Sequence, residues 1–219
     1  MSLQKIIAMH KKANPEFFIL DQEYLVTNDS TDIHNKIAIA EIPQGSTKKI
    51  SYCIIGWPNS FFDYTLMLDV QGTVELFFNV HLKQASAFSC SILYTISGKG
   101  SLTIKADIIH EELESKSMFL AKGIVSDSGS CTVQVKTRIN QEAIHSNALQ
   151  TIKHFVTSDN AVVVAMPIIE ALSDQIACKH GSSIGSFDQQ TILFLQSKGY
   201  DIDQAKKIIL DAFFQDNKQ

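Results

Sequence analysis

The feature that most constrains the fold is a long succession of short runs in which apolar and polar residues alternate. These runs recur from about Ile37 to Ile184, as in "KIAIAEI", "TVELFFNVHL", "FSCSILYTI" and "CTVQVKTRI". Segments rich in Gly, Ser, Asp and Pro, such as "PQGST", "SGKG" and "SDSGS", separate them. Alternation with a period of two gives a strand one apolar face, and the separating residues are those that form turns. The sequence therefore predicts an all-β body.

The alternation by itself leaves three architectures open: a sandwich, a barrel or a stacked solenoid. The tight segments "VQGTV" and "ISGKGSL" suit a hairpin and the corner of a solenoid equally well. No repeat of fixed length is visible, which weakens a solenoid prediction made from the pattern alone.

The end of the chain predicts a different structure, a pair of helices. Asp188 is a favourable N-cap for "QQTILFLQSK", and Gly199 stands where a helix C-terminus often places a glycine. Asp201 begins "IDQAKKIILDAFF", with Gln204 three residues later to complete a capping box. We therefore expect a two-helix hairpin to follow the β body.

Composition excludes several classes of protein. Hydrophobic residues make up 45% of the chain and charged residues 19%, which predicts a packed core rather than disorder. A formal net charge of −4 argues against general nucleic-acid binding. No apolar run approaches the roughly 18 residues that span a membrane, and the N-terminus lacks a signal-peptide pattern. We therefore expect a cytoplasmic protein that binds neither nucleic acid nor membrane.

Enzyme signatures are missing from the sequence. It contains no GxSxG, P-loop, HExxH or GxGxxG pattern. The segment "IIHEELES" groups His110 with Glu111, Glu112 and Glu114 and could hold a divalent ion, although a solvated loop is the favoured interpretation. A carbohydrate-active β-helix enzyme would need paired carboxylates, which no other segment supplies. The four cysteines form no CxxC pair, which argues for buried apolar roles and against structural zinc.

One pair of side chains stands out as a candidate site. Cys178 and His180 lie two positions apart, so on a strand they would share a face and could meet one metal ion. A single such pair cannot close a metal site. From this chemistry alone, a buried cysteine and a hydrogen-bonded histidine at a strand end is the favoured interpretation.

The segment "IACKHGSSIGSFDQQ", the upstream "ALQTIKHFVTSDNAVVVAMPIIEALSDQ" and the two helices together resemble the C-terminal end of the SufB/SufD family of iron–sulfur cluster assembly proteins. The resemblance is specific over about residues 118–214 and plausible over 37–117. The "CKHG" form is similar to the SufD branch, because the SufB branch tends to carry a second carboxylate where Gly181 stands. Family members are generally longer, so the chain is expected to be a shortened and divergent one.

The resemblance implies a right-handed parallel β-helix with a helical C-terminal subdomain, which favours the solenoid among the three architectures. The expected organisation is a partly helical N-terminal segment (1–36) containing a short helix at 2–12, a β-helix core (37–187) and a helical subdomain (188–219). Within the motif, Gly181 and Gly185 would supply backbone, and the chain would turn a corner at 181–183 before the first helix.

The resemblance also implies a non-catalytic scaffold role in an ATPase-driven assembly complex. Through its β-helix the chain would pair with a SufB-like subunit or with a second copy of itself. His180, with Cys178 beside it, would be a candidate ligand for iron or a transient cluster, with no tightly bound cofactor. A SufC-type ATPase would dock on the helices, whose apolar residues are Ile192, Leu195, Ile208, Ile209 and Phe213. The alternative is an interaction module of the same fold that has lost cluster handling.

Overall fold

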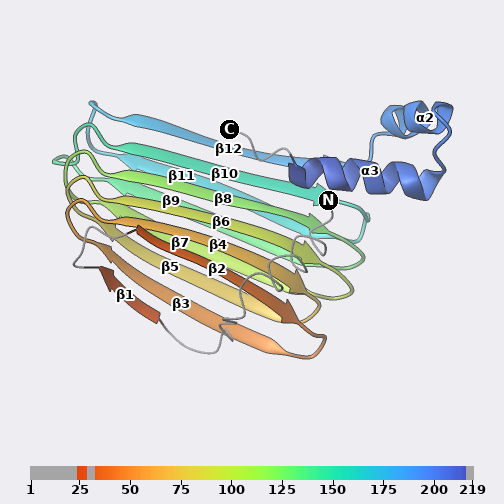
Figure 1. Ribbon diagram of the computed structural model, residues 1–219, viewed down its shortest axis with the longest axis horizontal. Coiled ribbons are helices and arrows are strands. Elements are labelled where there is room, and N and C mark those ends of the chain that lie inside the picture. Colours follow the sequence, from red (N-terminus) through yellow and green to blue (C-terminus); the bar gives the residue numbers. More distant parts are fainter. Residues whose placement is uncertain (1–23, 29–32, 216–219) are drawn as a thin grey trace.

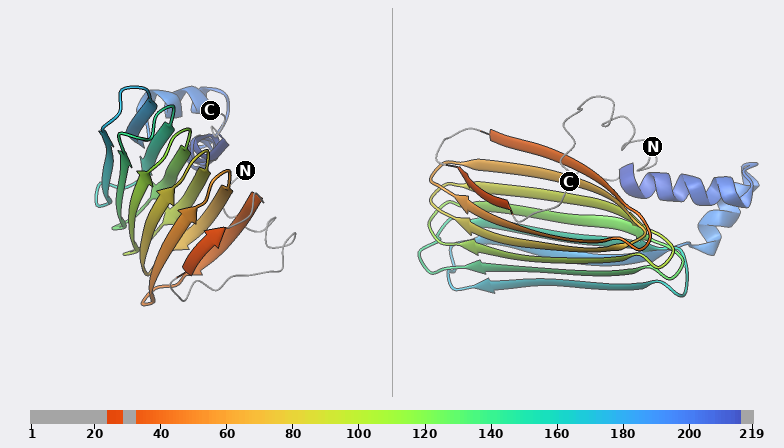
Figure 2. Two further views of the ribbon diagram at one scale, coloured as in Figure 1. Left: turned by 90° about the vertical axis from the view of Figure 1, so that its left-hand side faces the viewer. Right: turned by 90° about the horizontal axis from the view of Figure 1, so that it is seen from below.

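The computed structural model describes residues 24–28 and 33–215, which form a parallel β-solenoid followed by two helices (Figure 1). Successive strands alternate between two sheets, so the chain winds through coils of two strands each. The view along the strands shows the two sheets facing each other (Figure 2). The predicted mainly β solenoid with a C-terminal helix pair is confirmed, and the sandwich and the barrel are excluded.

Each sheet contains six strands, all paired in parallel. Sheet A comprises β1 (Tyr24–Asn28), β3 (Thr47–Gly56), β5 (Thr73–Leu82), β7 (Ser101–His110), β9 (Ser130–Ile139) and β11 (Val162–Ala171). Sheet B comprises β2 (Ile33–Ile42), β4 (Phe61–Val70), β6 (Ala87–Ile96), β8 (Lys116–Val125), β10 (Asn147–Val156) and β12 (Ala177–Ser186). The helices are α2 (Gln189–Ser197) and α3 (Ile202–Gln215).

Alternating burial along the strands builds the interior. In β5, for example, every second side chain from Val74 to Leu82 is buried while its neighbours are exposed or half-buried. Residues in register on neighbouring strands point to the same face, so inward side chains stack in rows along the solenoid. One such row stacks the rings of Tyr52 and Phe78 at a centroid distance of 4.7 Å. Most of the interior therefore forms one apolar core, and a smaller separate cluster of Ile139, Ala143 and Ala148 lies near the end of the solenoid.

A repeat that the sequence conceals lies at one corner of the coils, where sheet A passes to sheet B. The residue before each even-numbered strand from β4 to β10 is a buried serine, and the residue before that serine has a positive φ. The serines are Ser60, Ser86, Ser115 and Ser146, and the positive-φ residues are Asn59, Ala85, Glu114 and His145. Ala and Glu are not typical of positive φ, so turn composition does not reveal this repeat.

Variable coil length hides the periodicity further. Equivalent strands begin 26 residues apart at Phe61 and Ala87 but 32 apart at Ser130 and Val162. The turns absorb these differences while the strands keep a constant length of ten residues from β2 onward. A search for a repeat of fixed length in the sequence therefore fails even though the coils are equivalent.

Helix α3 packs on the outer face of sheet B. From α3, Phe214 is buried, and Ile209, Leu210 and Phe213 pack beside it against Met67, Leu93, Ile124 and Phe155 of four neighbouring strands. Both helices extend beyond the ends of the strands (Figures 1 and 2). The predicted caps are confirmed: Asp188 accepts from the Thr191 N–H at 2.9 Å, and Gly199 has a φ of 93°. Asp201 and Gln204 exchange the two hydrogen bonds of a capping box, at 2.8 and 3.0 Å.

The expected helix at 2–12 lies outside the described residues. The domain boundaries at 36 and 187 stay predictions, with β2 beginning at Ile33. Within the described part of the chain, no helix is long and apolar enough to cross a membrane.

Candidate functional site at the open end of the solenoid

Cys178 and His180 lie on β12, the last strand of sheet B. The register of β12 on β10 pairs Cys178 with Ala148 and His180 with Gln150. Ala148 and Gln150 are buried, so these positions face the interior. The structure therefore places both candidate ligands on one face, as their spacing predicted, and that face is the inner one.

No further coil covers β12 within the described part of the chain. All ten residues of this strand are exposed, including Cys178 and His180, although their side chains face inward. The expected corner at 181–183 is wrong, because Gly181 and Ser183 lie in the middle of β12 and pair with Thr151 and Lys153 of β10. Small residues suggested a turn, but on an exposed edge strand the side chains have no core to fill, so small residues are tolerated there too. The turn into α2 comes after Ser186.

Strand β11 forms the other half of this open end. It pairs only with β9 among the described strands, so one of its edges has no strand partner, as does one edge of β12. Both faces of β11 carry apolar side chains, and the outward ones are exposed: Val162, Val164, Met166 and Ile168. Exposed edge strands offer unpaired backbone groups to another chain, and proteins usually blunt them with charge. Here β12 contains one charged residue, Lys179, so its edge remains suited to pairing.

The cysteines differ in their surroundings. Cys90 and Cys131 are buried, as predicted, and burial raises the pKa of Cys131 to about 12. Cys178 is exposed. Partial desolvation raises the pKa of the Cys178 thiol, and a hydrogen bond with the backbone of Ala148 acts in the opposite direction. The Cys178 thiol is therefore protonated at neutral pH, and binding a metal as thiolate would release a proton.

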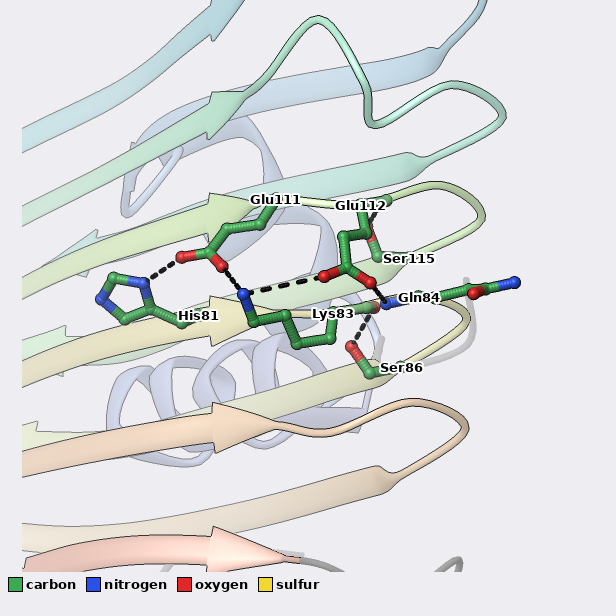
Figure 3. A network of polar contacts seen from close by, with 7 residues as sticks. All are labelled: His81, Lys83, Gln84, Ser86, Glu111, Glu112 and Ser115. Carbon is green, nitrogen blue, oxygen red and sulfur yellow. Dashed lines mark hydrogen bonds and ion pairs between the residues drawn. The ribbon is translucent and has the colours of Figure 1, made fainter.

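The acidic segment "IIHEELES" forms an ion-pair network instead of a metal site (Figure 3). Glu111 bonds His81 Nδ1 at 2.6 Å and also pairs with the Lys83 ammonium, and Glu112 Oε1 lies 3.7 Å from Lys83 Nζ. Partial burial would raise the pKa of Glu111, but the hydrogen bonds from Lys83 and His81 outweigh it and hold the pKa below its usual range. The carboxylates therefore link neighbouring coils.

The histidine of this segment is separate from that network. His110 is buried, and its Nδ1 and Nε2 lie 2.8 Å from the hydroxyls of Ser115 and Ser117. Among the described residues, no group of three or more His, Cys, Asp or Glu side chains is placed to hold a metal ion. A site at Cys178 and His180 would accordingly need ligands from elsewhere.

The helix residues expected to dock a partner divide into two groups. Ile192 is buried, and Ile209 and Phe213 pack on the β body. Ile208 is exposed, and Leu195 is half-buried. Four further exposed apolar side chains lie on or between the helices, outside the set expected to dock a partner: Leu193, Phe194, Tyr200 and Ile202. Helical spacing identifies an apolar face but does not indicate which apolar residues the tertiary structure leaves exposed.

Comparison with known proteins fits this geometry. A model of the family described as SUF system FeS cluster assembly, SufBD core domain, matches residues 70–213, which include the solenoid coils from β5 onward, the open end and most of the helix pair. The chain belongs to the SufBD core family. The predicted membership is thereby confirmed.

Several characterised relatives carry SufD names, in agreement with the predicted SufD-like branch. SufD of Escherichia coli is 31% identical over 94 residues, which is 43% of this chain and 22% of that protein. SufD of Bacillus subtilis is 27% identical over 120 residues, or 54% and 28% of the two chains. The chloroplastic protein ABCI7 of Arabidopsis thaliana is 25% identical over 139 residues, 62% of this chain and 29% of that protein. The matched regions thus span less than a third of these relatives.

Proposed function

We propose that this SufBD family member is a non-catalytic scaffold subunit in Suf-type iron–sulfur cluster assembly. The observation that carries the proposal is the open end of the solenoid, where Cys178 and His180 share the inner face of an edge strand. A thiol and an imidazole are suitable ligands for iron. Two ligands from one chain leave an iron site incomplete, so the remaining ligands would come from a partner seated on this end or from the cluster's own sulfide.

The partner we propose for this end is a SufB-like subunit or a second copy of the chain. The unpaired edges of β11 and β12 would continue their sheets into those of the partner, which is β-strand addition. The exposed apolar side chains of β11, together with Leu172 and Ile184, would then be covered. Pairing of this kind would close the interior around Cys178 and His180 and exclude water from them.

We further propose that a SufC-type ATPase docks on the helix pair. The support is a set of exposed apolar side chains on two helices that extend beyond the strands, namely Leu193, Phe194, Tyr200, Ile202 and Ile208. Ile209 and Phe213 would not contact the ATPase but would support the docking surface by fixing α3 to sheet B. The docking surface would therefore be the face of the helix pair directed away from the β body.

Anaerobic reconstitution tests the cluster role. The purified chain is incubated with iron and sulfide, alone and with a SufB-like protein and SufC from the same source, and visible absorption and bound iron are measured. We expect His180→Ala and Cys178→Ala to lose most of the bound iron. Ser182→Ala on the same face and Cys53→Ala on sheet A are matched controls that should retain it. If all variants match the wild type and no ATPase co-purifies, the proposal fails and the alternative, an interaction module without cluster handling, takes its place.

A further inference from the structure

Gln150 is the neighbour of His180 on the adjacent strand of sheet B. The two residues are in register on β10 and β12, and neighbouring strands are about 4.8 Å apart. Both side chains face inward, but Gln150 is 1% exposed whereas His180 is exposed. Glutamine is seldom buried to this extent unless its amide has hydrogen-bond partners.

The contacts of Gln150 fix the orientation of its amide. Its Nε2 donates to Thr137 Oγ1 at 2.7 Å and to the carbonyl oxygen of Ile168 at 3.0 Å. A carbonyl oxygen can only accept, so the amide nitrogen must remain on that side. The other end, Oε1, is buried and has no hydrogen-bond partner among the described residues. A buried acceptor that receives no hydrogen bond destabilises the folded state. Oε1 is such an acceptor and is held in a fixed place, so we look for a nearby N–H that can donate to it.

His180 can supply that N–H. A neutral imidazole donates from one ring nitrogen and accepts or ligates through the other, and histidines that ligate metals usually donate their second N–H to a neighbouring acceptor. Because the His180 side chain is exposed, it can change rotamer freely and turn toward Oε1. Adjacent inward positions on paired strands are within reach of side chains of this length.

We propose that Gln150 is a positioning residue for His180. Its Oε1 accepts the N–H of one imidazole nitrogen and holds His180 in a single tautomer, which directs the lone pair of the other nitrogen to the open end. The role in metal ligation rests on the proposed function, whereas the hydrogen bond and the tautomer do not. Thr137 and the Ile168 carbonyl complete the arrangement by keeping the Gln150 amide in place.

Nitrogen-15 NMR of the metal-free chain, with labelled histidine and at a pH where His180 is neutral, measures the tautomer. We expect the ratio of the favoured His180 tautomer to the other one to fall by about fivefold or more in Gln150→Met, since the free energy of an ordinary hydrogen bond corresponds to about that factor. Ile152→Val, on the same strand and face, is the packing control and should preserve the ratio.

An unchanged ratio in a folded Gln150→Met protein would overturn the proposal. If that variant does not fold, Thr137→Val decides, because it releases one anchor of the amide. We expect an intermediate ratio, and a wild-type ratio there would equally refute the role of Gln150. Anaerobic Fe²⁺ titration then tests ligation: we expect affinity to fall about 10- to 100-fold in Gln150→Met. A wild type that binds no Fe²⁺ would count against the proposed function while leaving the tautomer result intact.

Discussion

Strands β8 and β12 belong to the same sheet and have the same length, but their environments are opposite. Seven residues of β8 are buried, whereas all ten of β12 are exposed. The row that passes through Tyr94, Gly123, His154 and Ile184 shows the change: its first three residues are buried, and its last, on β12, is 58% exposed. The middle coils are thus closed by packing, while the final coil offers an inner face to whatever binds there.

In the middle coils, the closed part of the solenoid, side chains make close contacts that few other residues could make. Tyr94 on β6 lies across Gly123 on β8, and its hydroxyl is 2.8 Å from His154 Nδ1 on β10. The missing side chain at Gly123 makes room for the ring. At Gly181 on β12, by contrast, an added Cβ would meet nothing within 4 Å. Residues at the open end are therefore free of core packing and can be selected for chemistry or for a partner.

The largest expected difference between the two regions comes from adding a methyl group to each glycine. In Gly123→Ala the new Cβ would lie 2.1 Å from the Tyr94 ring, so the ring must move and lose its bond to His154. We expect a loss of about 3 kcal/mol or more in unfolding free energy, at the upper end for overpacked cores. Gly181→Ala should stay within about 0.5 kcal/mol of the wild type. Urea denaturation measures both, and equal losses would contradict the division into closed and open regions.

Acid should weaken the closed part at a pH where most carboxylates are still ionised. Burial lowers the pKa of His110 and of His154 to about 4, from an ordinary value near 6.5. The unfolded chain therefore binds protons first, and stability that is complete above pH 6.5 is lost as the pH falls toward 4. Each histidine should lower the free energy of unfolding by about 2 kcal/mol at pH 5.

Unfolding free energies at pH 7 and pH 5 measure this loss. His110→Asn and His154→Asn should each remove about half of the pH dependence, even if they lower the stability at pH 7. A wild type equally stable at both pH values would show that these histidines do not stay neutral in the folded state.

The smallest expected effect concerns the junction between the open end and the helix pair. Asp188 caps α2 by accepting from the Thr191 N–H and hydroxyl, at 2.9 and 2.7 Å, and these bonds hold the pKa of Asp188 below its usual range. We expect Asp188→Ala to destabilise α2 by about 1 kcal/mol. Amide hydrogen exchange should accelerate in α2 and remain unchanged in β8, and Asp188→Asn should retain most of the protection. Faster exchange in β8 would mean that the helix pair and the solenoid unfold together.

Local patterns determined much of this structure. Alternation predicted strands with one buried face, because that face must leave water whatever it packs against. Capping residues predicted both helices at Asp188 and Asp201, because each cap acts within three residues of itself. The "CKHG" motif and its flanking segments indicated the family and placed Cys178 and His180 on one face, which depends only on strand geometry.

Only the tertiary structure decided which strands are neighbours, and therefore which residues form the site. Parallel pairing joins residues 26 to 32 positions apart, with the difference absorbed by turns whose positive φ falls on residues such as Ala85 and Glu114. The sequence places Gln150 and His180 thirty positions apart, and only the register brings them together. Exposure was decided in the same way: β12 has the same length as the strands before it, and it is open because no further coil packs on it within the described residues. Helical spacing likewise gave α3 an apolar face, but packing on sheet B determined that Ile209 is covered and Ile208 exposed.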